Sequence, residues 1–372
     1  MRARPALLIA LVGCGPASPT PAPAQTDARF EPVVAYLRSQ VDSAFPSAVI
    51  AVGQRGRVVL LAAVGHYGID DPRPVTPETL YDLASLTKVI GLTSMCVLLV
   101  AERKLDLDAP VQRYVPAFQG PGKERITVRH LLTHSSGLPA WRPLYTEATT
   151  RGTAFALADT TPLANEPGRV MVYSDLGAIV LTQVVEAITG ERLDQLLDRR
   201  LFGPLGMAST RFLPPAEWRD RIAPTERSQD GTIIRGTVHD ENAWKLGGVS
   251  GHAGLFSTAP DLARFAGWLL RAWQRDSLGV RAFTQRQGIP PGSSRALGWD
   301  TPSENSSAGT KLGPKAFGHT GFTGTSIWLD PDKDLFIILL TNRVHPTREN
   351  GRISRVRPRV ADLVVDALTP PQ

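Results

Sequence analysis

The sequence predicts a mixed α/β (α+β) fold, in which helices flank an antiparallel sheet built from both chain ends. β-rich runs lie near the N-terminal end, at Ala48–Val52 and Arg57–Val64, and again near the C-terminal end, at Thr325–Asp330 and Leu335–Thr341. Between them, roughly from residue 90 to 290, the apolar spacing is helical or absent. Strands at both ends and helices in the middle favour one sheet with a helical insertion.

The N-terminal elements follow from local patterns. Residues 28–43 have apolar side chains at helical spacing. The two N-terminal β-rich runs are joined by Gln54-Arg55-Gly56, which predicts a hairpin. From Leu86 to Ala101 the chain is apolar nearly all round, so a buried helix is expected there. At 16 residues that helix is too short and too polar to span a bilayer.

The later elements carry clear start and stop signals. Short and long helices are expected at Thr127–Thr133, at Leu176–Thr189, which Gly190 closes, and at Pro260–Arg275. The loop Pro331-Asp332-Lys333-Asp334 has the turn chemistry of a second hairpin. A closing helix over Asn350–Leu368 carries five arginines, at positions 348, 352, 355, 357 and 359, in or just before it, and their spacing fits a solvated helix face.

The first residues have the features of an export signal. Arg2 and Arg4 precede a short apolar stretch, and Leu11-Val12-Gly13-Cys14 resembles a bacterial lipobox. We therefore expect a signal peptide over residues 1–14, a lipidated Cys14, a Pro/Ala-rich tether over 15–28 and one domain over 29–370. The alternative is a conventional cleavage after Ala22-Pro23-Ala24. Either case predicts a cell-envelope or secreted protein, and the first predicts a membrane contact through the lipid anchor.

Composition excludes several classes of function. The net charge is +6, but no aromatic or Gly-rich nucleic-acid motif accompanies the basic residues, so no nucleic-acid partner is expected. Only two cysteines are present, so there is no disulfide framework and no zinc-ligand spacing. Cys96 falls on the apolar helix and is expected to be inert core. We expect no cofactor and no metal, and the sequence leaves the oligomeric state open.

The first candidate for chemistry is Ser85-Leu86-Thr87-Lys88. Residues three apart on a helix share a face, so the Ser85 hydroxyl and the Lys88 amine point into the same space. Burial disfavours an ammonium ion, which would leave the amine ready to accept the serine proton. A serine at a helix N-terminus also lies near free backbone N–H groups. The alternative is a helix-capping serine beside a lysine that reaches the surface.

Two further segments strengthen the catalytic interpretation. Tyr173 follows a Gly-containing loop and could share a proton with Lys88 and the leaving group. The run His319-Thr320-Gly321-Phe322 precedes a strand, where small residues allow a substrate to approach the sheet edge. Each segment also has an ordinary explanation, a tyrosine with a simple hydrogen-bond partner and a Gly-rich turn.

Together these segments resemble the serine β-lactamase and penicillin-binding-protein superfamily, and especially class C β-lactamase-like hydrolases. The motif order is S-L-T-K, Y-S-D and H-T-G, and the run from His130 to Leu138, H-L-L-T-H-S-S-G-L, is similar to a further family signature. The resemblance covers roughly residues 30–368. It implies that Ser85 is the acylated nucleophile, that Lys88 and Tyr173 move its proton, and that the backbone N–H groups of Ser85 and Phe322 form the oxyanion hole.

The chain departs from the family pattern at two positions. Asp175 stands where the family more often has Asn, and a carboxylate there would favour the ammonium form of Lys88. His319 stands where β-lactamases usually have Lys, which weakens the case for binding a β-lactam carboxylate. Whether Lys88 or Tyr173 is the first base therefore stays open.

A fourth segment, from Val238 to Ser257, is similar to a subgroup that includes exo-acting N-acetylmuramyl-L-alanine amidases. Its glycines would let the segment fold over the cleft, so that His239 could touch substrate. A metal site from His239, Asp240 and His252 is a weaker alternative, because no zincin spacing accompanies them. An ordered loop whose side chains bond its own backbone is another.

The resemblance implies a serine hydrolase acting on peptidoglycan-derived amides, as an amidase or D-Ala peptidase. The substrate would be a small peptide, a glycopeptide or an ester. A broad carboxylesterase or weak β-lactamase would use the same chemistry on another substrate. A penicillin-binding sensor module without turnover is a third alternative, although both Ser85 and Lys88 are present.

Overall fold

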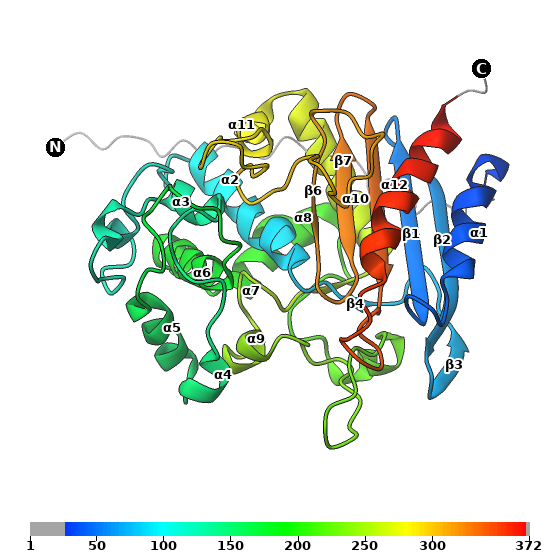
Figure 1. The fold of residues 1–372 in the computed structure, drawn as a ribbon, viewed down its shortest axis with the longest axis horizontal. Coiled ribbons are helices and arrows are strands. Elements are labelled where there is room, and N and C mark those ends of the chain that lie inside the picture. Colours follow the sequence, from blue (N-terminus) through cyan, green and yellow to red (C-terminus); the bar gives the residue numbers. More distant parts are fainter. Residues whose placement is uncertain (1–26, 370–372) are drawn as a thin grey trace.

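The computed structural model describes residues 27–369. A six-stranded antiparallel sheet with the order β3-β2-β1-β8-β7-β6 forms its centre. Helices cover both faces, and a helical region extends from one side of the sheet (Figure 1). The fold class is therefore the one that the sequence predicts, with N-terminal and C-terminal strands meeting where β1 (Ser47–Gln54) pairs with β8 (Leu335–Thr341).

The four predicted strands are present, and their ends differ from the predicted bounds by a few residues at most. Strands β1 and β2 (Arg57–Gly68) form the first hairpin, and its turn residues Arg55 and Gly56 have φ of 51° and 74°. Both values lie in the left-handed region that a two-residue hairpin turn requires. Strands β7 (Ser326–Asp330) and β8 form the second hairpin, and β6 (Phe317–Thr320) pairs with β7 at the sheet edge. The sequence analysis missed the edge strand β6, as well as β3 (Asp71–Pro74) and the separate pair β4 (Tyr81–Asp82) and β5 (Phe256–Ser257).

The central strands bury both faces, because alternate side chains enter two different cores. On β1, Ala48, Ile50 and Val52 pack with helices α1 (Glu31–Ser39) and α12 (Ile353–Leu368). Val49 and Ala51 face the larger core shared with α10 (Ala259–Gln274) and the helical region. This double burial fixes the strand register, since a one-residue slip would exchange the two faces.

The helical region supplies most of the remaining elements. The predicted helix after Ser85 is present, but it begins with a π-helical segment, η2 (Lys88–Thr93), before α2 (Ser94–Ala101). Helix α6 (Asp175–Thr189) ends at Gly190, whose φ of 70° gives the expected left-handed cap. The other helices are α3 (Val128–Leu132), α4 (Leu144–Glu147), α5 (Arg151–Thr160), α7 (Leu193–Leu197), η5 (Asp198–Phe202), α8 (Gly203–Leu205), α9 (Glu241–Lys245) and α11 (Val280–Thr284), with short 3-10 turns η1 (Ala28–Phe30), η3 (Val111–Arg113), η4 (Lys123–Arg125), η6 (Ala216–Arg221) and η7 (Ser277–Gly279).

The proposed signal peptide and Cys14 lie outside the described residues. Nearly all of the predicted tether also lies outside them, and the first described residue, Asp27, caps the turn η1. Across residues 27–369, no helix is both long and apolar enough to pass through a membrane.

Candidate active site

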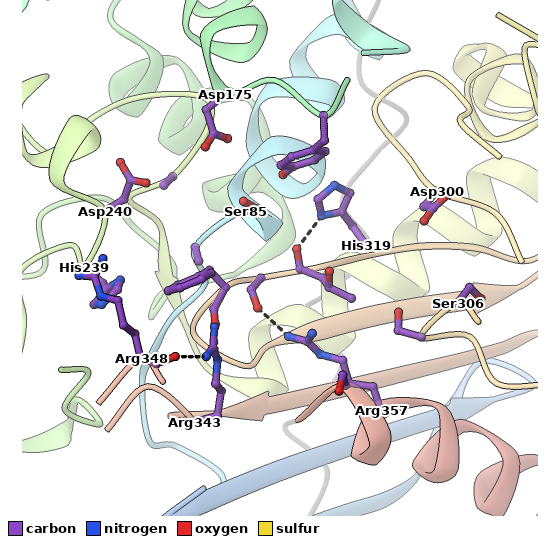
Figure 2. Close-up of a pocket in the computed structure, with 18 of the residues that line it drawn as sticks. Ser85, Asp175, His239, Asp240, Asp300, Ser306, His319, Arg343, Arg348 and Arg357 are labelled. Atoms are coloured by element: carbon purple, nitrogen blue, oxygen red, sulfur yellow. Dashed lines mark hydrogen bonds between the residues drawn. The ribbon is translucent and has the colours of Figure 1, made fainter. Parts of the chain in front are cut away.

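A cavity of about 700 Å³ lies where the helical region meets the edge strand β6. One wall comes from the segment around Ser85, the loop before α6 and residues 239–253. The other wall comes from β6, its following turn and α12 (Figure 2). The sequence motifs therefore converge on one cavity, although they lie far apart in the chain.

Ser85 sits on a strained turn at the start of its helix. The preceding residue, Ala84, has φ of 46°, a conformation that costs energy for a residue with a Cβ. The buried Asp82 side chain accepts the Ala84 N–H at 2.8 Å, and Leu83 N–H donates to Leu255 O at 2.9 Å. These bonds hold the turn in place, so the Ser85 hydroxyl is presented at the cavity floor.

Lys88 lies beside Ser85, as the spacing predicts, and its side chain is buried. Its Nζ donates to Ser85 Oγ at 3.0 Å and to His252 O at 3.0 Å, and it lies 2.6 Å from Asp175 Oδ1. An ammonium group has three N–H donors, and here two of them have acceptors, while the Asp175 carboxylate forms an ion pair with the same nitrogen. Burial alone would lower the pKa of Lys88, but the negative charge of Asp175 outweighs it and raises that pKa. The amine is therefore charged at rest, which corrects the expectation from burial alone.

Tyr173 completes this group from the loop before α6. Its ring centroid lies 4.9 Å from Lys88 Nζ and 4.5 Å from the ring of His134. His134 comes from the T-H-S-S-G segment and fixes the loop, because its carbonyl accepts Val172 N–H and its Nδ1 accepts Ser174 N–H. The buried Tyr173 hydroxyl has no hydrogen-bond partner among the described residues. Burial raises the pKa of Tyr173, so the phenol is neutral at rest.

His319, on the edge strand β6, carries no charge. Its Nδ1–H donates to Thr320 O at 2.8 Å, which leaves Nε2 as a buried acceptor without a partner in residues 27–369 (Figure 2). Burial, with Arg295 and Lys88 nearby, lowers the pKa of His319 well below its ordinary value. The centroids of His319 and Tyr173 are 5.8 Å apart, so the two walls meet at these rings.

The turn after β6 is shaped for close approach. A Cβ on Gly321 would lie 2.2 Å from Thr325 Oγ1 and 2.4 Å from Leu83 O, so only glycine fits there. Thr323 and Thr325 donate to the carbonyls of Asp82 and Leu83, which ties this turn to the one that carries Ser85. Within the described chain, the backbone N–H groups of Ser85 and Phe322 donate to no other group. Two free donors thus flank the cavity floor.

The segment from Val238 to Ser257 lines the cavity, but its histidines are paired with carboxylates. His239 Nε2 lies 3.0 Å from Glu226, and His252 Nε2 lies 2.8 Å from Asp240. His239 also stacks on the Phe322 ring, with centroids 5.8 Å apart. No group of three metal-ligating side chains occurs in the part of the chain that the structure describes. The alternative metal site from these residues therefore has no geometric support.

Four arginines line the cavity, Arg295, Arg343, Arg348 and Arg357, and the sequence analysis assigned none of them to it. Arg295, from the loop after α11, lies over the Tyr173 ring at 5.3 Å. Its buried Nε and Nη1 make no hydrogen bond to described residues, and its nearest carboxylate, Asp300, is 4.0 Å away. Arg357 was expected on a solvated helix face, but both it and Arg348 line the cavity. No local pattern marks Arg295, because its neighbours in the cavity come from other segments.

Comparisons with known proteins identify the family and the fold. Residues 27–361 match the family model described as Beta-lactamase. A protein of Salmonella typhi named "Putative D-alanyl-D-alanine carboxypeptidase" is 32% identical over 364 positions, which cover 86% of this chain and 84% of the relative. A penicillin-binding protein homolog from Caulobacter crescentus has a TM-score of 0.72 at 21% identity, covering 92% of this chain and 98% of the other. A class C beta-lactamase from Rhodobacter sphaeroides has a TM-score of 0.71 at 21% identity, covering 91% and 99%.

Proposed function

The chain belongs to the beta-lactamase family of serine hydrolases, and from this premise we propose that it removes the C-terminal residue from wall-derived peptides. The acyl-enzyme would form on Ser85. The 32% identity to relatives named as D-alanyl-D-alanine carboxypeptidases supports this choice within the family.

The proposed reaction uses both walls of the cavity. Ser85 Oγ attacks the scissile carbonyl carbon while its proton passes to the Lys88–Tyr173 pair, and the carbonyl electrons move onto oxygen. The N–H groups of Ser85 and Phe322 would stabilise that oxyanion. On collapse the C–N bond breaks and the leaving amine takes the proton. Water then attacks the acyl ester by the same route, which releases the shortened peptide and restores Ser85.

The resting protonation state sets a requirement for this route. Lys88 is a charged ammonium group paired with Asp175, and Tyr173 is a neutral phenol, so neither can accept a proton as they stand. The pair must first lose one proton to solvent. Because the two groups interact strongly, that proton belongs to the pair rather than to either residue. Activity should therefore rise with pH through one apparent pKa.

The Arg295 guanidinium, whose Nε and Nη1 have no hydrogen-bond partner among the described residues, carries the proposal of a carboxypeptidase. A buried cationic group with free N–H donors is costly unless a ligand supplies the acceptor. A guanidinium prefers a carboxylate, which it can bind through two parallel hydrogen bonds. Arg295 lies beside Tyr173 and near the neutral His319, so it would receive a terminal carboxylate close to the scissile bond. An ester substrate without a carboxylate would offer no such acceptor.

The test is release of D-alanine from a peptide ending in D-Ala-D-Ala, measured against the same peptide with a C-terminal amide. We expect the free carboxylate to be strongly preferred. Arg295→Ala should lower kcat/KM for the carboxylate peptide by about 10- to 100-fold, the range expected for a lost charged hydrogen bond. The same substitution should leave kcat/KM for the amide-capped peptide nearly unchanged. Arg275→Ala, at an exposed position after α10, is the matched control.

Equal cleavage of both peptides would contradict the carboxypeptidase proposal. Turnover of p-nitrophenyl esters without any peptide cleavage would favour the esterase alternative. Acylation by penicillin with no turnover of any substrate would favour the sensor module.

We also propose that the protein is held in the cell envelope through a lipid on Cys14, which the lipobox-like segment supports. Incorporation of a labelled fatty acid into the wild type, but not into Cys14→Ala, is the expected result. Labelling of neither, with the mature chain starting after Ala24, would contradict it.

A further inference from the structure

Two arginines from the C-terminal part of the chain hold the turn after β6. Arg357 Nη2 donates to Gly321 O at 2.6 Å and to Thr325 O at 2.8 Å. Arg343 Nε donates to the next carbonyl, Phe322 O, at 2.7 Å. Figure 2 shows Arg357 reaching this turn from the side of α12, with Ser85 on the other side. Neither arginine has an ion-pair partner within the described residues.

The hydrogen bond from Arg357 determines where one backbone donor points. In a trans peptide the C=O and the following N–H point in opposite directions. The Gly321 carbonyl faces Arg357 and also accepts Gly324 N–H at 3.1 Å. The N–H of the same peptide, that of Phe322, must then face away from Arg357, towards the Ser85 side of the turn. That N–H makes no other bond in residues 27–369.

We infer that Arg357 is a positioning residue that fixes the Phe322 N–H as an oxyanion donor. The inference rests on the proposed acyl-enzyme chemistry at Ser85. Without Arg357 only the turn bond from Gly324 holds the Gly321 carbonyl, and the peptide gains freedom to rotate. A donor that must reorganise during the reaction stabilises the oxyanion less than one already in place.

The positive charge of Arg357 should also stabilise the oxyanion. Its Nε is shielded from solvent and has no partner in the described chain. Burial, with Arg343 nearby, lowers the pKa of Arg357, which reflects a cation held without a compensating carboxylate. An uncompensated positive charge behind the donor peptide favours negative charge on the substrate oxygen. Lys88, by contrast, is compensated by Asp175.

The experiment compares Arg357→Ala, Arg357→Lys and the matched control Arg355→Ala, which removes an exposed arginine from the same helix. An activated ester serves as substrate, so the result does not depend on the natural peptide. We expect Arg357→Ala to lower kcat by about 10- to 100-fold, less than the loss of a whole oxyanion donor, with KM changed by less than about threefold. Affinity for a boronic acid that forms a tetrahedral adduct should fall by a similar factor as kcat.

Two readouts separate positioning from a general structural role. Added guanidinium ion should restore part of the activity of Arg357→Ala, and Arg357→Lys should keep more activity than Arg357→Ala because it keeps the charge. Arg355→Ala should match the wild type. Unchanged kcat and boronate affinity in both Arg357 variants would overturn the inference while leaving the acyl-enzyme intact. Absence of any Ser85 adduct in the wild type would instead overturn the proposed function.

Discussion

The two walls of the cavity hold their cations in opposite ways. On the helical wall, the Lys88 ammonium is matched by the Asp175 carboxylate at 2.6 Å. On the strand wall, Arg357 donates only to neutral carbonyls, and the adjacent His319 is uncharged. The helical wall therefore has an internal charge balance and groups that exchange protons. The strand wall has fixed donors and an excess positive charge.

This difference suggests a division of roles. A matched ion pair can lose or gain a proton with a modest change in local field, which suits proton transfer to and from Ser85. Unmatched fixed donors suit a charge that develops only during the reaction, because they need no rearrangement when it appears. Substitutions on each wall should therefore have different kinetic signatures.

The largest effect should come from the helical wall, by Ser85→Ala. Removing the nucleophile should lower kcat by about 10⁴-fold or more, with residual turnover from the strand wall and binding alone. Steady-state ester hydrolysis and intact mass after penicillin treatment measure the loss of turnover and of the adduct. A variant that keeps more than a few per cent of wild-type turnover would mean that another group is the nucleophile.

The next effect should come from the strand wall, by Gly321→Ala. The new Cβ would lie 2.2 Å from Thr325 Oγ1 and 2.4 Å from Leu83 O, so the turn must shift and carry the Phe322 N–H with it. We expect kcat to fall by about 10²-fold, as for the loss of an oxyanion donor. Gly351→Ala is the matched control, since nothing lies within 4 Å of its Cβ. Equal activity of both variants would remove the Phe322 N–H from the mechanism.

The two walls also differ in how far the sequence revealed them. Ser85 and Lys88 are three residues apart, so helical spacing alone predicted their contact, and the structure confirms it at 3.0 Å. The effect of Asp175 on Lys88 was anticipated from the family resemblance, because Asp175 occupies the motif position that more often holds Asn. Short-range spacing is reliable because the local backbone fixes it.

The strand wall depends on contacts between distant segments. Arg357 follows Gly321 by 36 residues, and its inward direction depends on how α12 packs on the sheet. The arginine spacing in and just before α12 indicated a solvated face, which is correct for Arg352, Arg355 and Arg359, whereas Arg348 and Arg357 line the cavity. Helical periodicity gives the face of a helix but not what lies against it. For the same reason Arg295 could not be found from its own neighbours in sequence.

The smallest effect, and the sharpest test of the comparison, should come from Asp175→Asn. This variant removes the charge that balances Lys88 and makes the helical wall resemble the strand wall. Burial lowers the pKa of Lys88 and Asp175 is the strongest opposing influence, so the pKa of Lys88 should fall in the variant. The proton of the Lys88–Tyr173 pair then leaves at lower pH. In a plot of kcat/KM against pH, the rising limb should move to lower pH by about one unit or more.

At pH values below the rising limb of the wild type, Asp175→Asn should therefore be up to about tenfold more active, while the plateau at high pH stays unchanged.

The same variant should be less stable than the wild type. Because the pKa of Lys88 is raised in the folded protein, the ion pair of Lys88 with Asp175 contributes to the free energy of unfolding. This contribution is fully present below the pKa of unfolded lysine. The Tm at neutral pH should thus be lower in the variant. Asp300→Asn, at a cavity carboxylate beside Arg295, should leave the limb in place. A limb that stays fixed or moves to higher pH in Asp175→Asn would show that the group titrating in the free enzyme is not the Lys88–Tyr173 pair, and the proton route would have to be assigned elsewhere.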